Sequence, residues 1–142
     1  MTFEQATELL TIMKAAFPNA YKGMSLKDAE TVCKMWATQF SQIDGNLVML
    51  AVKRLIKTCT FAPSIAEVRV ELKNIYEEAK GALMFQNLDS LYSEEMLRKL
   101  KYIVAKLECM DARRDETSLL SDLKGFDMLR LGGGGHYEKI QE

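Results

Sequence analysis

The chain has 142 residues, of which 48% are apolar and 27% charged, and its formal net charge is −1. These values are ordinary for a folded domain with its own core, and they exclude a chain that is disordered throughout. The balance of charge argues against avid nonspecific binding to nucleic acid. The sequence shows neither the basic and apolar regions of an export signal nor an apolar run of about 18 residues, so we expect a protein that is neither exported nor membrane-spanning.

Two helices are predicted in the first 40 residues. Thr2 and Gln5 have the spacing of a capping box, and apolar residues then recur at helical spacing until Pro18 ends the run. After a turn-rich stretch, Ser25 is placed to cap a second helix whose apolar stripe ends near Phe40.

A third helix is predicted over residues 47–58, LVMLAVKRLIKT, which are apolar on most sides and therefore predicted to lie at the centre of the core. The preceding SQIDGN is predicted to be a loop because of its Asp-Gly pair and its asparagine. A fourth helix is predicted to begin at Ser64, which forms a capping box with Glu67, and to stop at Gly81. The sequence therefore predicts an all-α fold with a four-helix docking domain over residues 1–82.

The segment 83–118 has the rhythm of a coiled-coil seam, because apolar residues alternate in steps of four and three. This fifth helix either packs on its own domain or joins a partner helix, and the pattern does not choose between the two. The candidate self-association residues are Met96, Leu100, Ile103, Leu107 and Met110.

Residues 119–142 are predicted to be a flexible, partner-binding tail. Their apolar residues form short clusters that Gly125 splits, and four consecutive glycines follow. Such a segment can order on a partner as an amphipathic element. The candidate partner-binding residues are Leu119, Leu120, Leu123, Phe126, Met128, Leu129 and Leu131.

The sequence offers little chemistry for catalysis or for a cofactor. His136 is the one histidine and it follows the glycine run, so neither a catalytic histidine pair nor a histidine metal cluster is possible. Cys33, Cys59 and Cys109 have no metal-binding or redox spacing and are predicted to be reduced thiols in a cytosol. We expect no enzyme activity, no metal and no cofactor.

Basic residues cluster at Lys53, Arg54 and Lys57, where the spacing of four places the two lysines on one helix face. This face is a weak candidate for phosphate contacts, while a solvated edge of a buried helix explains the same pattern. The balanced net charge favours the solvated edge, so little or no direct nucleic-acid binding is expected.

Several stretches of the first eighty residues resemble one known family. MTFEQATELLTIMKAAFPNAY is followed by LVMLAVKRLIKT, which leads into FAPSIAEVR. The landmarks are Phe17-Pro18, Trp36, Phe40, Ala51-Val52-Lys53-Arg54 and Pro63-Ser64-Ile65-Ala66-Glu67. In their order and spacing these residues resemble the phage replicative-helicase loader and inhibitor family.

The resemblance implies a non-enzymatic phage protein that acts during DNA replication in the cytoplasm of the bacterial host. Proteins of this family bind the hexameric replicative DNA helicase, hold it inactive, and couple it to an origin-bound initiator. They have an ordered helical N-terminal domain and a mobile C-terminal region that reaches the helicase. Two other interpretations stay open on the residues alone: a DNA-binding replication adaptor or initiator fragment, and a self-associating structural module that forms a homodimer.

Overall fold

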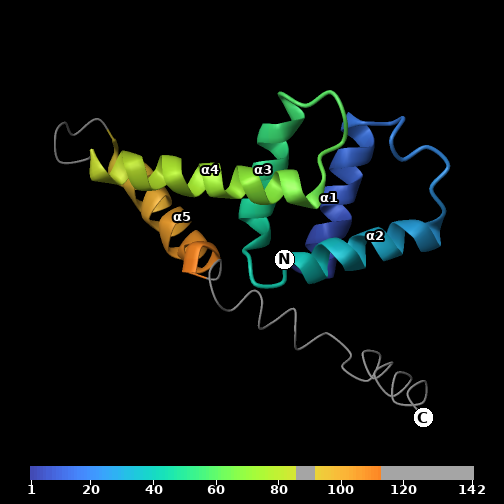
Figure 1. Cartoon of the computed structure of the whole chain (residues 1–142), viewed down its shortest axis with the longest axis horizontal. Helices are drawn as coiled ribbons and strands as arrows, with labels where there is room; N and C mark the ends of the chain where they lie inside the picture. The colour runs from blue at the N-terminus through green and yellow to red at the C-terminus, as the bar shows by residue number, and fades with distance from the viewer. Residues whose placement is uncertain (86–91, 113–142) are drawn as a thin grey trace, which may run out of the picture. The chain divides into compact units, whose positions relative to one another are not determined.

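The computed structural model describes residues 1–85 and 92–112 of the chain. Within these residues it contains five α-helices and no strand, which confirms the predicted all-α fold (Figure 1). The helices are α1 (Phe3–Ala16), α2 (Leu26–Gln39), α3 (Gly45–Ile56), α4 (Ile65–Met84) and α5 (Glu94–Ala112). The chain divides into two compact units, Met1–Cys109 and Met110–Glu142. The predicted flexible tail at 119–142 lies outside the described residues, and the division at residues 82 and 118 stays a prediction.

Three helices begin with a capping box. In α1 the Thr2 hydroxyl accepts a hydrogen bond from the Gln5 backbone N–H, and the Gln5 side chain accepts one from the Thr2 N–H. Ser64 and Glu67 make the same pair of bonds at the start of α4, which confirms both predicted boxes. Ser25 caps α2 as predicted, and its third residue, Asp28, completes a box there as well.

Two predicted helix ends are wrong. The third helix begins at Gly45 rather than Leu47, because the Asp44 carboxylate accepts a hydrogen bond from the Asn46 N–H at 2.9 Å and caps the helix two residues early. The fourth helix does not stop at Gly81 but runs on to Met84. A glycine ends a helix where its φ is positive, and of the glycines in the described residues only Gly23, before α2, has a positive φ.

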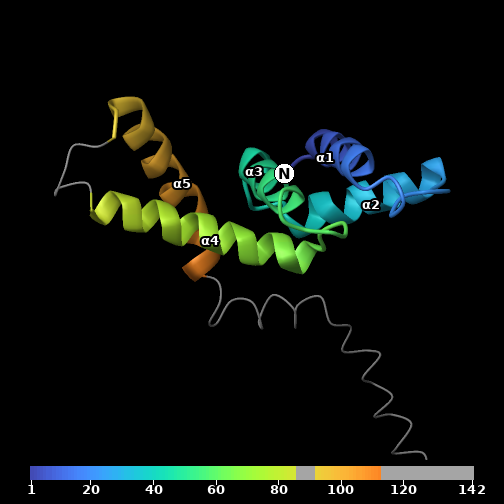
Figure 2. The same cartoon turned by 90° about the horizontal axis from the view of Figure 1, so that it is seen from above.

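The core is built by three pairs of packed helices. α1 packs against α2, α3 packs against α4, and α3 also contacts α1, so that α3 is central as predicted (Figure 2). The approach of α1 to α3 is close at Gly45, which is buried; a Cβ there would collide with the Gln5 side chain. The large side chains that are nearly inaccessible to solvent are Phe40, Leu9, Met13, Leu72, Leu107, Val48, Val52 and Val68.

An aromatic group closes one end of the core where α2 meets α4. The rings of Trp36 and Phe40 lie with centroids 5.7 Å apart, and the Arg69 guanidinium lies 5.5 Å from the Phe40 centroid. Arg69 also donates hydrogen bonds to the backbone and side-chain oxygens of Gln39. The residues that made Trp36 and Phe40 landmarks of the sequence are therefore core residues, with exposed fractions of 7% and 0%.

α5 contacts the rest of its unit through a few side chains. The Ser93 hydroxyl accepts a hydrogen bond from the Met96 N–H at its start. Leu107 is 1% exposed, whereas Met96, near the start of the helix, is 45% exposed. The Tyr102 hydroxyl donates a hydrogen bond to Asp44, the residue that caps α3. The Tyr102 side chain is thereby fixed to the start of α3.

Candidate partner-binding surfaces

The basic cluster of α3 is part of an ionic clamp between α3 and α4. The Arg54 guanidinium donates two hydrogen bonds of 2.8 Å to the two carboxylate oxygens of Glu78. Its Nε lies 2.8 Å from a carboxylate oxygen of Glu71. Two-pronged arginine–carboxylate pairs are strong and specific in geometry. The clamp therefore fixes the register of α4 on α3.

The clamp changes the protonation of both partners in the direction that favours charge. The hydrogen bond from Arg54 lowers the pKa of Glu78 below its ordinary value, against a small opposing effect of burial. The hydrogen bond to Glu78 likewise raises the pKa of Arg54. Both groups are therefore fully charged near neutral pH, and the pair persists there.

This geometry bears on the predicted DNA-contact residues. Arg54 has two carboxylates of its own chain around it, so a phosphate would have to compete with them for the guanidinium. Lys53 and Lys57 are exposed on α3. The structure thus leaves two of the three cations facing solvent and gives the third a structural partner, and DNA binding at this cluster stays a prediction.

The five candidate self-association residues have different surroundings. Leu107 is buried by its own chain, Leu100 and Ile103 are half-buried, and Met96 is exposed. The side chain of Met110 lies outside the described residues, and so do the seven tail residues from Leu119 to Leu131. The C-terminal end of the predicted seam is therefore occupied within the unit, and self-association through the rest stays a prediction.

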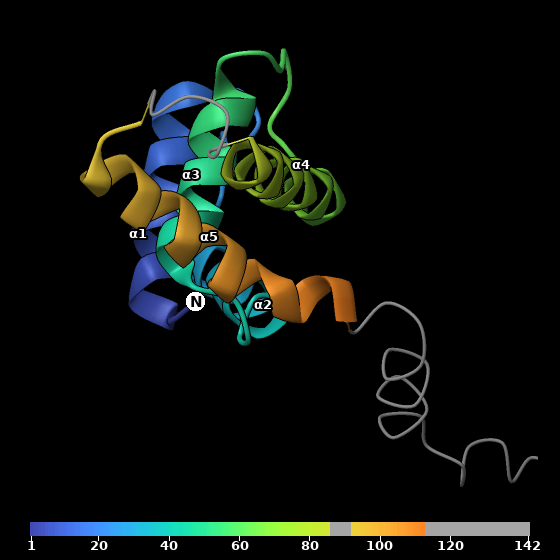
Figure 3. The ribbon, with the colours of Figure 1, turned by 90° about the vertical axis from the view of Figure 1, so that its left-hand side faces the viewer.

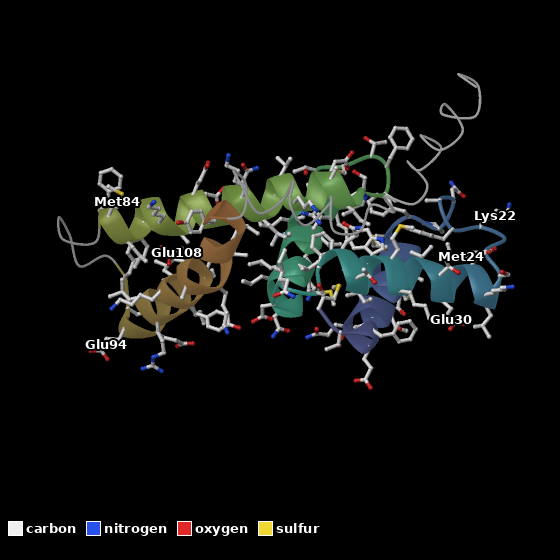
Figure 4. The ribbon with its side chains drawn as sticks, turned by 60° about the horizontal axis from the view of Figure 1, so that its bottom comes forward. Lys22, Met24, Glu30, Met84, Glu94 and Glu108 are labelled. Atoms are coloured by element: carbon white, nitrogen blue, oxygen red, sulfur yellow. The ribbon has the colours of Figure 1, made fainter. Side chains whose placement is uncertain are left out.

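Several large apolar side chains are exposed that the sequence analysis did not single out. Phe61, in the loop between α3 and α4, is 83% exposed, although Pro63 two residues later is buried. Met84 and Phe85 at the end of α4 are 71% and 68% exposed, and Figure 4 shows Met84 on the last turn of that helix. Phe61 stands outside every helical apolar stripe, which is the signal in the sequence that could have identified it. Exposed aromatic residues of this kind commonly anchor protein partners.

Other features of the described residues are structural. Cys33 is buried and Cys59 is half-buried, and both are free thiols. No group of three or more metal-ligating side chains occurs in residues 1–85 and 92–112. In the same residues no helix combines the length and apolar character needed to cross a membrane.

These observations define a class: an all-α protein whose described residues form a capped helical domain with exposed aromatic anchors. The comparison with protein families is more specific. Residues 1–69 match the family model of the N-terminal domain of the phage helicase loader and inhibitor proteins. This N-terminal segment therefore belongs to the phage helicase loader and inhibitor family, which confirms the resemblance seen in the sequence. No significant match is found among curated proteins or among solved structures.

The match covers α1, α2, α3 and the first turn of α4, and it ends at Arg69. It indicates a phage helicase-associated replication protein, from a family with a non-catalytic role that implies interaction with a replicative helicase. The rest of α4 and the whole of α5 lie beyond it.

Proposed function

We propose that the protein binds the hexameric replicative DNA helicase of the phage-infected cell, inhibits it, and helps to load it at an origin marked by an initiator protein. The observation that carries this proposal is the family match over residues 1–69. The fold supports it, because the matched segment comprises three helices with a common core and a capped start of the fourth. The protein acts in this proposal as a binding module in the cytoplasm of the bacterial host.

The work is divided between two parts of the chain. Residues 1–82 serve as a docking platform, and the apolar residues of the tail at 119–142 order on a groove of the helicase. On the platform, Phe61 is the best placed anchor, since it is 83% exposed and lies inside the matched region. Burying such a ring at an interface removes a large apolar surface from water.

Inhibition in this proposal requires no chemistry from the protein itself. The sequence has no phosphate-binding motif, so any effect on ATP turnover arises from preferential binding to one conformation of the helicase. Tight binding to an inactive conformation slows the motor, and release of the protein restores it. The helicase is loaded when the protein is released at the origin.

The first experiment is capture of the helicase in the presence of ATP by the full chain and by a chain cut after residue 118. Helicase ATPase activity is measured with both. We expect capture and inhibition by the full chain and a loss of at least tenfold in affinity on truncation, which corresponds to about 1.4 kcal/mol. Equal capture by both chains would contradict a role for the tail, and capture by neither would contradict helicase binding.

The platform is tested by a matched pair of aromatic substitutions. Phe61→Ser and Phe85→Ser each remove an exposed phenyl ring, but only Phe61 lies in the matched region. We expect Phe61→Ser to weaken helicase capture and Phe85→Ser to leave it unchanged, with the same unfolding midpoint for both. Equal effects on capture would rule out Phe61 as a specific anchor.

A further inference from the structure

The charge of α5 is segregated in a way that the net charge of the chain hides. Between Met96 and Leu107 the sequence has four basic residues and no acidic residue, whereas the chain as a whole carries a formal charge of −1. The basic residues are Arg98, Lys99, Lys101 and Lys106, and all four are exposed. A local positive surface therefore exists on a nearly neutral protein.

Three of these cations lie with one tyrosine on a single side of the helix. Arg98, Lys101, Tyr102 and Lys106 are separated by steps of three and four residues, which places them on one face. We call this set the α5 basic face. Leu107, which is buried, lies on the opposite side, so the face points to solvent (Figure 3).

The described residues leave most of this charge available. Lys99 pairs with Glu95 one turn earlier at 3.2 Å. Arg98 and Lys101 have no carboxylate partner in the described part of the chain, and the Lys106 ammonium lies 5.7 Å from the centroid of the Tyr102 ring. In this respect the face differs from Arg54, which two carboxylates surround.

Tyr102 gives the face a fixed flat surface. Its hydroxyl donates a hydrogen bond to Asp44, yet the side chain as a whole is 43% exposed. Its ring, with Ile103 and the stems of Arg98 and Lys99, lines a shallow open depression whose walls are apolar. The surface therefore combines an apolar floor with a cationic rim.

We propose that the α5 basic face binds single-stranded nucleic acid. A base stacks in the apolar depression against Tyr102, while Arg98, Lys101 and Lys106 contact the flanking phosphates. Unpaired bases stack on aromatic rings beside basic residues in many single-strand-binding proteins. A duplex keeps its bases inside, and an acidic peptide has no use for the apolar floor, so a single strand fits both halves of the surface. This site goes beyond the proposed function and does not rest on helicase binding.

The test is the fluorescence anisotropy of labelled oligo(dT) of about 20 nucleotides, titrated with the full chain at low ionic strength. The variant Arg98→Gln/Lys101→Gln/Lys106→Gln is compared with Lys14→Gln/Lys22→Gln/Lys27→Gln, which removes the same charge from exposed residues of the N-terminal helices. We expect the first variant to lose at least tenfold in affinity, with a salt slope smaller by about 2, and the second to stay within about twofold of the unchanged chain.

Tyr102 separates stacking from simple charge attraction. Tyr102→Phe keeps the ring and is expected to bind almost as the unchanged chain does, whereas Tyr102→Leu is expected to weaken binding several-fold. Circular dichroism of each variant checks that α5 is still formed. No retention of oligo(dT) by the unchanged chain, or equal losses in the two triple variants, would overturn the proposal. It is also overturned if an equally long duplex or polyglutamate competes as well as oligo(dT), because the face is then only a polyanion surface.

Discussion

The packed helices α1 to α4 and the helix α5 are stabilised in different ways. In the first region every helix contributes several side chains to a common core, and three of the four helices begin with a capping box. In α5 only Leu107 is buried among the described side chains, and Tyr102 makes a single hydrogen bond to the start of α3. Hydrophobic stabilisation scales with the apolar area buried, so the first region is expected to dominate the stability of the unit.

The family match follows the same division. It ends at Arg69, which bonds to Gln39 and covers the Phe40 ring at the junction of α2 and α4. Everything that this junction needs is therefore inside the matched segment. The helix beyond it has less buried surface and more segregated charge, as a surface element that contacts other molecules would have.

The largest predicted effect is loss of the aromatic group in the core. Phe40 has an exposed fraction of 0% and contacts Trp36 and Arg69, so Phe40→Ala leaves a cavity that the neighbouring helices cannot fill. We expect the free energy of unfolding to fall by about 3–5 kcal/mol. Urea denaturation followed by circular dichroism measures the change, with the exposed Phe61→Ala as the matched control. Similar losses for the two variants would remove the distinction between core and surface aromatics.

The second prediction asks whether α5 unfolds with the core. Leu107→Ala removes the buried side chain of that helix, and we expect a cost of about 2–3 kcal/mol to the docking of α5. Hydrogen exchange is expected to show faster exchange in α5 and almost unchanged exchange in α1 to α4, because few contacts join them. Uniformly faster exchange in all five helices would show that the two regions are one cooperative unit.

The third prediction concerns the clamp between α3 and α4. Arg54→Ala removes three short contacts and is expected to lower the stability by about 1–2 kcal/mol, since the pair is partly exposed. Because the pKa of Glu78 is lowered in the folded state, its contribution is present above the ordinary value of 4.5 and is lost as the pH falls below it. Urea midpoints of the unchanged chain and of Glu78→Gln are therefore expected to differ at pH 7 and to converge in acid.

The control for the clamp is Glu77→Gln on the adjacent position. Glu77 lies 3.8 Å from Lys73 within the same helix, so it does not join two helices. We expect a much smaller change in stability at pH 7, in the range of a surface pair. A Glu77 effect as large as that of Glu78 would indicate that the charge of α4, rather than the clamp, matters.

The parts of the fold that the sequence predicts well are local. The capping boxes at Thr2 and Ser64 depend on residues three positions apart, and the apolar stripes of the first four helices follow from helical spacing alone. The clamp was missed because Arg54 and Glu78 are 24 residues apart and on different helices. Along the sequence, Arg54 belongs to a basic cluster, and only the packing of α3 on α4 shows that it is a structural residue.

The candidate site shows the same limit. The rhythm of steps of three and four in α5 predicts which residues share a face, but it does not say what covers that face. In the structure Leu107 is covered by its own chain, while the opposite side presents the basic residues and Tyr102. The interpretation of the seam as a partner surface rested on the apolar residues alone and left out the charges between them.

The smallest predicted effect is a gain, and it tests the end of α4, where the matched region is left behind. Gly81 has a helical φ, and a Cβ added there would meet nothing within 4 Å. Gly81→Ala therefore keeps the same contacts while reducing the freedom of the unfolded chain, and we expect stabilisation by about 0.5–1 kcal/mol. The gain is measurable as a higher urea midpoint, and Gly23→Ala, where φ is +79°, is expected to lose stability instead. If Gly81→Ala were destabilising or weakened binding to the helicase, the end of α4 would be a contact surface that needs the bare backbone, and the platform would extend beyond the residues that the family match covers.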